Sequence, residues 1–348
     1  LAHCSDPVGK LTADLQSFKP NFVLSVPRIF EEIYNGAEAK AEAAGKGKIF
    51  RKAASVAIAY SKAMEKGHVS PVLRLQHGLF DHLVFAKLRA VMGGNVDAAI
   101  SGGAPLGERL GHFYRGAGVR VLEGYGLTET TAGATLNLTQ SSKVGSVGRP
   151  LPGTTVKIAD DGEIWLRGSN VLKGYWKNPD ATKSTFEGEW FKTGDIGSLD
   201  EDGFLAITGR KKELIITAGG KNVAPALLED PLRANPLVSQ AVVIGDAKPF
   251  VSVLISIDEE MLPIWLENNG IKEKLTLDQA RTNPAVLAEI SRAIENVNKD
   301  FSTAESIRKF ALLPTDLTEK SGHLTPSLKI KRPKVMADFA IHVDRIYG

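Results

Sequence analysis

A strand, a helix and a second strand follow one another within residues 97–122, and this order restricts the possible folds more than any other feature. Residues 97–101 are apolar, residues 106–116 have helical spacing, and residues 119–122 are apolar again. Strands joined in this way must run parallel, with a right-handed crossover. The loops SGGAP and EGYGLTET, which follow the two strands, then lie at one edge of the sheet. Open α/β sheets bind ligands at that edge, so we expect a binding site there.

The pattern of apolar residues changes along the rest of the chain. Residues 29–66 are rich in Ala, Glu and Lys and predict one or two amphipathic helices. From residue 153, apolar runs flanking two Asp-Gly turns predict the hairpins of a small β subdomain. Beyond residue 210, a turn at AGGK, a helix over 226–232 and strands over 238–244 and 250–257 predict an α+β domain. We therefore expect three parts: part of a large α/β domain over 1–150, its β subdomain over 151–209, and a C-terminal α+β domain over 210–348.

Composition excludes several classes of protein. With 348 residues, the chain exceeds the size of a single hydrophobic core, so at least two domains are expected. Its 43 basic and 40 acidic side chains leave a formal charge of +3, without the basic arm or stripe that nucleic-acid binding needs. A single cysteine, Cys4, excludes an internal disulfide framework and indicates a reducing compartment such as the cytoplasm.

Neither the apolar runs nor the start of the chain indicates insertion into a membrane. The longest apolar runs, such as 250–257, are too short for a spanning helix. The start, LAHCSDPVGK, has no cationic segment leading into an apolar one, unlike a signal peptide, and no initiating Met. We expect the chain to be a processed or truncated part of a longer one.

The loop YGLTET at 125–130 carries the residue types that a nucleotide site needs. Tyr125 can place its ring against a base, Thr128 offers a hydroxyl to a phosphate oxygen, and Glu129 offers a hard oxygen ligand to Mg²⁺. The glycines allow a ligand to approach the backbone closely. The same residues fit a glycine-rich turn capped by Thr and Glu at the start of a helix, and the loop alone leaves both interpretations open. It is not a dinucleotide fingerprint, because Glu129 stands where the third glycine belongs.

Charged residues later in the chain also have two interpretations each. Asp195, in KTGD, could accept hydrogen bonds from two vicinal ribose hydroxyls, or it could be an ordinary turn aspartate. Arg210 could bind phosphate or ribose, or pair at the surface. The run LTPSLKIKRPK is either a solvated cationic face or a site from which one lysine reaches an anionic ligand; its cations are Lys329, Lys331, Arg332 and Lys334. The histidines form no metal-ligand pattern.

Taken together, the order of these motifs resembles the adenylate-forming superfamily, which includes acyl-CoA synthetases, luciferases and peptide-synthetase adenylation domains. The blocks that carry the resemblance cover residues 101–332: SGGAPL, EGYGLTET, GEIWLRGSNVLKGYW, WFKTGD, GRKKELIITAGGKN and LTPSLKIKR. SVPRIFEEIY at 25–34 and the form LTPSLKIKR resemble the long-chain fatty-acid–CoA ligase branch. The resemblance implies the acyl-CoA synthetase fold, with its N-terminal portion missing here.

Residue by residue, the resemblance implies a nucleotide site. Thr128 would touch the α-phosphate, and Glu129 would help to hold Mg²⁺. Asp195 and Arg210 would bind the ribose. The residues that would contact adenine or line its pocket are Gly103, Ala104, Glu123, Gly124 and Tyr125.

The resemblance also implies a mobile C-terminal domain. Lys212 matches the hinge position, and Gly219 and Gly220 match the loop that lines the pantetheine tunnel of CoA. Lys329 matches the mobile catalytic lysine, which here follows a Thr-Pro-Ser segment that we expect to be flexible.

The implied activity is that of a long-chain fatty-acid–CoA ligase. A fatty carboxylate attacks the α-phosphorus of ATP to give acyl-AMP and pyrophosphate, and the CoA thiol then attacks the acyl carbon to give acyl-CoA and AMP. Peripheral membrane contact suits such insoluble substrates, although no strongly basic amphipathic helix in the sequence demands it. The sequence indicates neither an oligomeric state nor a chain-length preference. One alternative is a fatty acyl-AMP ligase that loads a carrier protein, and another is a non-catalytic nucleotide-binding module.

Two departures from the family pattern bear on this activity. Nothing in the chain matches the threonine-, serine- and glycine-rich phosphate loop, which lies upstream of all these blocks in the family. We therefore expect the 348 residues by themselves to catalyse very little pyrophosphate exchange. Ile216 stands where luciferase-like relatives carry a second lysine, which argues against luciferase-like chemistry.

Overall fold

The computed structural model of the protein describes residues 11–325 and 329–348. Contacts divide the chain into two compact units, Leu1–Ile207 and Thr208–Gly348. The expectations for Cys4 and for a flexible segment at Pro326 and Ser327 concern residues outside the described ranges.

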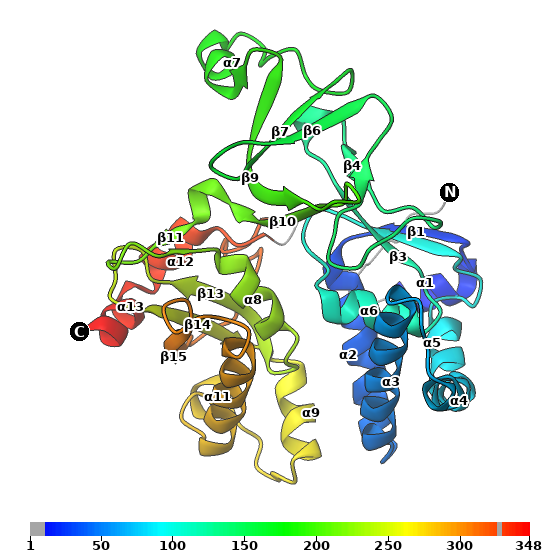
Figure 1. Cartoon of the computed structure of the whole chain (residues 1–348). Helices are drawn as coiled ribbons and strands as arrows, with labels where there is room; N and C mark the ends of the chain where they lie inside the picture. The colour runs from blue at the N-terminus through cyan, green and yellow to red at the C-terminus, as the bar shows by residue number, and fades with distance from the viewer. Residues whose placement is uncertain (1–10, 326–328) are drawn as a thin grey trace. The chain divides into compact units, whose positions relative to one another are not determined.

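The first unit is built on a sheet with the strand order β1-β2-β3-β4-β5 (Figure 1). Its strands are β1 (Phe22–Ser25), β2 (Ala98–Ser101), β3 (Val121–Tyr125), β4 (Thr135–Leu136) and β5 (Arg149–Pro150). Its helices are α1 (Leu11–Phe18), α2 (Pro27–Ala43), α3 (Gly47–Glu65), α4 (Pro71–Phe80), α5 (Ala86–Val91) and α6 (Glu108–Gly116). A π turn over Asp81–Phe85 joins α4 to α5.

The parallel pairing of β1, β2 and β3 confirms the strand–helix–strand prediction for residues 97–122. Val23, Ala99 and Val121 are neighbours across the three strands and so share one face of the sheet. That face packs on the core formed with the helices, for example with Phe30 of α2 and Phe113 of α6. The carboxyl ends of β2 and β3 therefore meet at one edge, as the sequence predicts.

A second sheet in the same unit has the order β10-β9-β7-β6, and β8 pairs with β9. The elements of this part are β6 (Thr154–Ile158), β7 (Glu163–Gly168), α7 (Pro179–Thr185), β8 (Phe186–Glu187), β9 (Trp190–Leu199) and β10 (Leu205–Arg210). The two predicted hairpins are present, and the turn glycines Gly162 and Gly203 have φ values of +84° and +80°. Other residues rarely adopt such angles, so glycine favours both turns.

The second unit is an α+β domain around a sheet with the order β13-β14-β15. Every residue of β13 and β14 is buried, because helices cover both faces of the sheet. Ala241 packs with Leu228 and Ile290 on one face, and Val242 packs with Val335 on the other. The elements are β11 (Ile215–Ile216), β12 (Asn222–Val223), α8 (Pro225–Arg233), β13 (Val238–Ile244), β14 (Val251–Ile257), α9 (Met261–Asn268), α10 (Leu277–Ala280), α11 (Pro284–Asn298), β15 (Ile307–Leu312), α12 (Arg332–Asp338) and α13 (Ala340–Tyr347). The predicted turn at AGGK, the helix and the two strands are thus confirmed.

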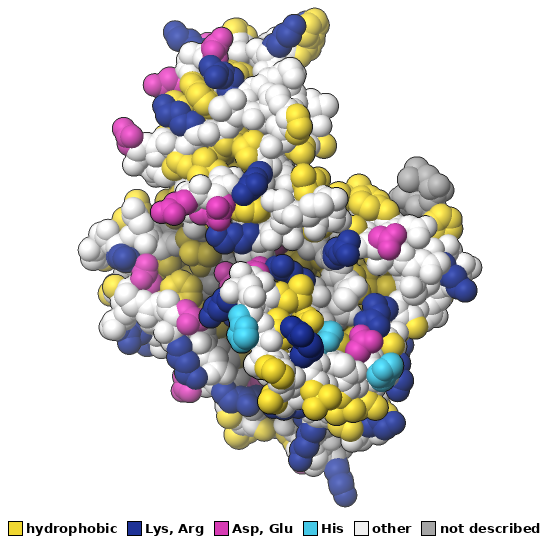
Figure 2. All heavy atoms as spheres, turned by 45° about the vertical axis from the view of Figure 1, so that its right-hand side comes forward, with side chains coloured by type: hydrophobic (Ala, Val, Ile, Leu, Met, Phe, Trp, Pro, Cys, Tyr) yellow, Lys and Arg dark blue, Asp and Glu magenta, His cyan; other side chains and the backbone are white. Residues whose placement is uncertain are grey.

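The surface of the first unit carries a concentration of apolar side chains. Figure 2 shows hydrophobic side chains gathered among lysine, arginine and histidine side chains in the lower part of the view. Among the exposed large hydrophobic residues of this unit are Leu75 and Leu79 of α4. Among the helices of residues 11–325 and 329–348, none is long and apolar enough to cross a bilayer.

Candidate functional site

Tyr125 and Asp195 are in contact although they lie 70 positions apart in the sequence. Tyr125 is the last residue of β3, and its hydroxyl donates a 2.6 Å hydrogen bond to Oδ2 of Asp195, in β9 of the second sheet. Asp195 is only 4% exposed. A buried carboxylate needs hydrogen-bond donors to offset its lost hydration, and the tyrosine supplies one. Two residues that sequence analysis assigned to adenine and to ribose are thus side by side.

An irregularity in strand pairing determines where Asp195 points. The register of β9 against β7 shifts beside Glu163, so that residues 193–195 leave the regular ladder. Such bulges commonly reorient side chains next to active sites. Oε1 of the buried Glu163 accepts a 2.9 Å hydrogen bond from the Gly194 N–H, and the Asp195 N–H donates to Oγ1 of Thr193 at 3.0 Å. The backbone at Asp195 is therefore fixed by Glu163 of the neighbouring strand β7 and by Thr193 of the same bulge.

The loop after β2 is tied to β3 by a carboxylate. Oε2 of Glu123 accepts a 2.9 Å hydrogen bond from the backbone N–H of Leu106, and Glu123 is 9% exposed. Gly103, in the same loop, has a φ of +87°, and both Gly103 and Ala104 are exposed. Gly124 follows Glu123 in β3 and pairs with β4. The side chain of Glu123 thus positions the loop, and the contact of these four residues with adenine remains a prediction.

The turn after β3 requires its glycine for a structural reason. A Cβ atom on Gly126 would lie 1.5 Å from the carbonyl oxygen of Ala132, so no other residue fits there without moving the backbone. The buried Thr130 closes the same turn, because its Oγ1 accepts a 2.9 Å hydrogen bond from the N–H of Leu127. A threonine, Thr130, therefore caps this turn as the capped-turn interpretation expects, whereas Glu129 does not cap it.

Thr128 and Glu129 lie in a short 3₁₀ turn, Thr128–Thr130, where Thr128 is exposed and Glu129 is half-buried. Oε1 of Glu129 accepts a 3.0 Å hydrogen bond from the hydroxyl of Tyr175. Burial and this bond to the carboxylate together raise the pKa of the Tyr175 hydroxyl above its ordinary value of 10. Tyr175 thus orients the carboxylate that the sequence assigns to Mg²⁺.

The oxygen ligands near Glu129 suffice for a magnesium ion only if a bound nucleotide adds its phosphate oxygens. The described residues contain no group of three or more His, Cys, Asp or Glu side chains that could hold a metal. Mg²⁺ is usually bound in nucleotide sites by one or two carboxylates, by phosphate oxygens and by water. Glu129 matches the single carboxylate of such a site.

In the second unit, Lys212 lies in a short 3₁₀ turn, Lys211–Glu213, directly after Arg210, the last residue of β10. Gly219 and Gly220 lie in the turn between β11 and β12, where Gly220 has a φ of +78°. All four residues are exposed. Their assigned roles in ribose binding, hinge motion and CoA binding remain predictions.

The backbone of Lys329 is fastened to Thr325 and its neighbours. A β-bridge joins Leu324 to Ile330, and the Thr325 N–H donates a 2.8 Å hydrogen bond to the Lys329 carbonyl. The Lys329 N–H donates in return to Oγ1 of Thr325 at 3.0 Å, and the Lys329 residue is exposed. The amine is therefore carried by a backbone position that is fixed to Thr325 at the surface of the second unit.

Arg332 anchors the same loop to the core of the second unit. Its guanidinium donates to both carboxylate oxygens of Glu229 at 2.8 Å and to the carbonyl of Val243 at 3.0 Å. The Glu229 side chain is only 5% exposed and also accepts from the Val243 N–H at 2.6 Å. The cationic run is therefore not simply a solvated face, because at least one of its members is an internal anchor.

Comparison with known proteins decides the family. Residues 2–176 match the family described as AMP-binding enzyme, and residues 212–348 match the AMP-binding enzyme C-terminal domain. The chain belongs to the AMP-binding enzyme family. It is 54% identical over 341 residues to the long-chain-fatty-acid–CoA ligase FadD15 of Mycobacterium tuberculosis, covering 98% of this chain and 57% of that protein. It is 32% identical to the long-chain-fatty-acid–CoA ligase ACSBG1 of Bos taurus, covering 97% of this chain and 50% of that protein.

Solved structures show that this AMP-binding enzyme has the adenylate-forming fold. It matches the adenylation domain of a carboxylate reductase from Mycobacterium chelonae with a TM-score of 0.71 at 20% identity, over 99% of this chain and 49% of that one. It also matches the anthranilate CoA ligase AuaEII, solved with anthranoyl-AMP, with a TM-score of 0.64 at 20% identity, over 97% of this chain and 54% of that one. The chain spans about half to three-fifths of the length of these relatives.

Several supporting residues of this AMP-binding enzyme escaped the sequence analysis. Glu163 bonds to the N–H of Gly194, next to Asp195, and Tyr175 bonds to Glu129. Both Glu163 and Tyr175 lie in the block GEIWLRGSNVLKGYW. That block was a resemblance signal, but nothing in it identified these two residues. Glu229, the partner of Arg332, lies outside every motif, and no sequence signal pointed to it.

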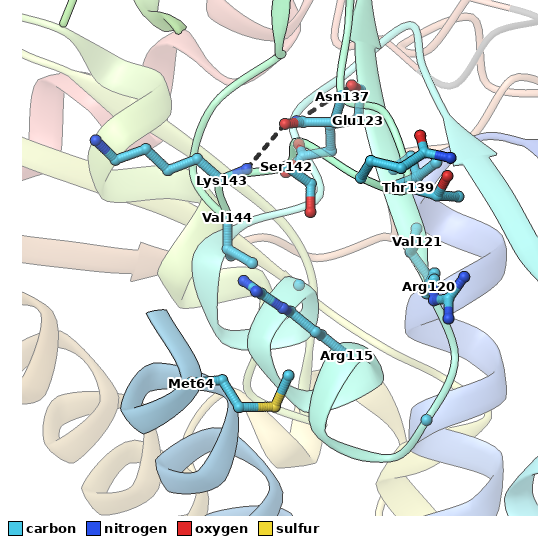
Figure 3. A pocket seen from close by; sticks show the side chains of 14 residues that line it. Met64, Arg115, Arg120, Val121, Glu123, Asn137, Thr139, Ser142, Lys143 and Val144 are labelled. Atoms are coloured by element: carbon cyan, nitrogen blue, oxygen red, sulfur yellow. Dashed lines mark hydrogen bonds between the residues drawn. The ribbon is translucent and has the colours of Figure 1, made fainter. Parts of the chain in front are cut away.

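A cavity of about 540 Å³ lies beside the amino-terminal part of β3, between the ends of α3 and α6 and the loop over 137–144 (Figure 3). Arg115, Arg120 and Lys143 contribute cationic side chains to its lining. Of the residues predicted to bind nucleotide, Glu123 lines this cavity, whereas Tyr125 and Asp195 do not. The cavity is therefore separate from the hydrogen bond between Tyr125, which is predicted to line the adenine pocket, and Asp195, which is predicted to bind the ribose.

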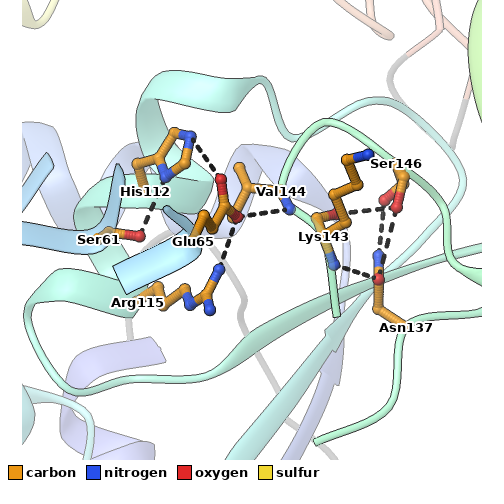
Figure 4. A network of polar contacts seen from close by, with 8 residues as sticks. All are labelled: Ser61, Glu65, His112, Arg115, Asn137, Lys143, Val144 and Ser146. Carbon is orange, nitrogen blue, oxygen red and sulfur yellow. Dashed lines mark hydrogen bonds and ion pairs between the residues drawn. The ribbon is translucent and has the colours of Figure 1, made fainter. Parts of the chain in front are cut away.

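A polar network beside this cavity fixes the loop over 137–144 to α3 and α6 (Figure 4). Oε1 of Glu65 accepts a 2.6 Å hydrogen bond from Arg115 and a 3.3 Å hydrogen bond from the N–H of Val144. Within the loop, Oδ1 of Asn137 accepts from the N–H of Lys143 at 3.0 Å. The network connects the helical layer to the segment that leads into β5.

His112 lies at the end of this network, where its surroundings disfavour its protonated form. It is buried, its Nδ1 lies 3.0 Å from Oγ of Ser61, and its Nε2 lies 3.9 Å from Oε2 of Glu65. Burial lowers the pKa of His112 below its ordinary value of 6.5, with Lys62 and Arg115 adding to the effect and Glu65 and Glu108 opposing it. The fold therefore favours the neutral imidazole.

We expect His112 to cost stability on acidification. Above pH 6.5 its contribution is complete, and it is lost as the pH falls from 6.5 through the lower pKa of the folded protein, because the unfolded chain takes up the proton first. The measurement is the free energy of unfolding between about pH 7.5 and 5.5, compared with His112→Gln. The variant should show a shallower fall, whereas a matched change at the exposed His68, His68→Gln, should not. Equal slopes in all three proteins would contradict this assignment.

Proposed function

We propose that this chain carries the adenylate-binding core and the mobile domain of a long-chain fatty-acid–CoA ligase. The observation that carries the proposal is the hydrogen bond between Tyr125 and the buried Asp195, at the edge where β2 and β3 end. It places an aromatic ring next to a carboxylate, the pair that a purine and its ribose diol need. The 54% identity to a long-chain-fatty-acid–CoA ligase supports the choice of substrates.

In the proposed first half-reaction, the chain positions ATP and neutralises charge. The ring of Tyr125 lies against adenine, and Asp195 accepts hydrogen bonds from the ribose hydroxyls. Thr128 donates its hydroxyl to the α-phosphate. A magnesium ion bound through Glu129 and the phosphate oxygens would offset charge that develops as the fatty carboxylate attacks. Such reactions depend on positioning and electrostatics more than on covalent help from the protein.

In the proposed second half-reaction, the C-terminal domain turns about Lys212 and brings the loop with Gly219 and Gly220 to the acyl-adenylate. The small size of these glycines leaves room for the pantetheine arm of CoA beside the backbone. Lys329 serves the first half-reaction, where its ammonium group stabilises the pentacovalent phosphate.

The test is an assay of the protein produced from its complete reading frame, with ATP, CoA and fatty acids of graded length. We expect CoA-dependent release of AMP that is largest with long chains. Asp195→Asn should raise KM for ATP by about 10–100-fold, since a charged acceptor for two hydroxyls is lost. Asp202→Asn, at an exposed turn of the same sheet, should not.

Two other results would overturn the proposal. Transfer of the acyl group to a carrier protein, with no response to CoA, would indicate a fatty acyl-AMP ligase. Nucleotide binding without pyrophosphate exchange would indicate a non-catalytic module.

A further inference from the structure

A hydrogen-bonded cluster surrounds the imidazole of His323, a short distance before Lys329 in the sequence. The side chain of His323 is only 7% exposed. Its Nδ1 atom lies 2.7 Å from Oγ of Ser321, and its Nε2 atom lies 2.9 Å from Oδ2 of Asp338, the last residue of α12. Both ring nitrogens are thus engaged, as is usual for buried polar groups. The ring therefore joins the chain before Lys329 to the helix that follows it.

The charge of Asp338 determines which ring nitrogen of His323 carries the proton. Hydrogen bonds from Lys334 and from His323 hold the pKa of the Asp338 carboxyl below its ordinary value, so this group is ionised at neutral pH. An ionised carboxylate only accepts hydrogen bonds, and Nε2 of His323 is therefore the donor. In the neutral ring, Nδ1 then accepts from the hydroxyl of Ser321. The ring is oriented from both of its sides.

The backbone of His323 belongs to the pairing that holds Lys329. The carbonyl of His323 accepts a 2.8 Å hydrogen bond from the N–H of Lys331. The antiparallel bridge next to it and the two hydrogen bonds between Thr325 and Lys329 continue the same pairing. A shift of His323 would therefore shift the backbone from which the Lys329 amine extends.

We propose that His323 is a positioning residue for Lys329. Its ring, bonded to Asp338 and Ser321, fixes the start of the antiparallel pairing and thereby the origin of the lysine side chain. His323 acts through the backbone, so it needs no contact with a substrate. Accurate placement matters, because a displacement of about 1 Å in a reacting group can cost roughly 100-fold in rate. The expected effect on the rate rests on the proposed role of Lys329 in adenylate formation, whereas the effect on the backbone pairing does not.

Hydrogen exchange measures the backbone pairing without any assay of activity. His323→Leu should accelerate exchange of the Lys331 amide by about tenfold or more, because the charge-assisted hydrogen bond to Asp338 is lost. The matched control is His342→Leu, since the rings of both histidines lie against Phe339, with centroids 5.3 Å away for His323 and 5.9 Å away for His342. The control should exchange like the wild type. Unchanged exchange in His323→Leu would overturn the proposal.

Two amide variants separate the two contacts of the ring. Glutamine can place an N–H donor near the position of Nε2, whereas asparagine can reach only the position of Nδ1. His323→Gln should therefore keep the bond to Asp338 and restore slow exchange, and His323→Asn should behave like His323→Leu. Equal exchange in all three variants would show that the bond to Asp338 does not hold the pairing, and would overturn the proposal.

Pyrophosphate exchange by the protein from its complete reading frame tests the effect on the amine. His323→Leu should lower kcat by about tenfold and leave KM for ATP near that of the wild type, because the proposed ATP site lies in the first unit. In the Lys329→Ala background the same substitution should cause no further loss, since His323 acts through that amine. An equal further loss in both backgrounds would overturn the proposal. If Lys329→Ala alone leaves the rate unchanged, the assigned role of Lys329 is wrong, and hydrogen exchange alone decides whether His323 positions its backbone.

Discussion

Replacing Lys329 with alanine is expected to lower the rate of acyl-adenylate formation by about 10²–10³-fold, the usual effect of removing one preorganised contact to a developing charge. The loop that carries Lys329 is closed by the bridge between Leu324 and Ile330, so its amine is presented by the second unit as a whole. Formation of the thioester from supplied acyl-adenylate should be largely spared, since that step is assigned to a different orientation of the domain.

The two half-reactions can be measured separately, by pyrophosphate exchange and by CoA-dependent consumption of acyl-adenylate. Lys331→Ala is the matched control, because Lys331 is an exposed cation two positions away. It should leave both rates close to those of the wild type. Equal loss of both half-reactions in Lys329→Ala would contradict the assigned role and would point to a general disturbance of the loop.

Arg332→Ala is expected to destabilise the second unit by about 3–5 kcal/mol, because it leaves the carboxylate of Glu229 buried without its partner. The Nη2 atom of the arginine donates to both oxygens of that carboxylate while its Nη1 atom donates to the carbonyl of Val243, and the single nitrogen of a lysine cannot reproduce both sets of contacts. Arg332→Lys should therefore recover only part of the loss. Since the anchor lies three positions after Lys329, adenylate formation should also fall at temperatures where the variant is still folded.

The effect of Arg332→Ala is measured as the change in the free energy of unfolding of the second unit, by chemical denaturation of the whole protein. Lys334→Ala serves as the control, because Lys334 pairs with Asp338 in an exposed position and its removal should change stability little. A double variant, Arg332→Met with Glu229→Leu, would remove both charges. It should be more stable than Arg332→Ala alone if the uncompensated charge causes the loss. Unchanged stability in Arg332→Ala would show that the pair contributes nothing.

Local patterns were sufficient for most of the fold. The strand–helix–strand unit over 97–122, the Asp-Gly hairpins and the strands over 238–244 and 250–257 are each encoded by neighbouring residues, through apolar spacing and turn chemistry. The expected division between the large domain and the C-terminal domain, after residue 209, falls close to Ile207, where the first compact unit ends. Hinge motion there remains a prediction.

The residues that hold the candidate site in place could not be predicted from local sequence patterns, because their hydrogen bonds join positions far apart in the sequence. Glu229 and Arg332 are 103 residues apart, and no periodicity connects them. The glycine at 126 was interpreted as room for a ligand, yet the carbonyl of Ala132 already requires it. For Glu123, the sequence indicated a residue of the pocket, and the structure adds a carboxylate that holds the neighbouring loop. Local sequence patterns identify the reactive side chains, whereas the residues that position those side chains are determined by tertiary packing.

The hydrogen bonds around Lys329 have a consequence for how far its amine can travel. Because the N–H and the carbonyl of Lys329 both bond to Thr325, and Ile330 pairs with Leu324, the Cα atom of Lys329 is held to the second unit. The ammonium group can therefore change its position within that unit only by rotation of its own side chain. Any longer displacement has to be a displacement of the second unit itself.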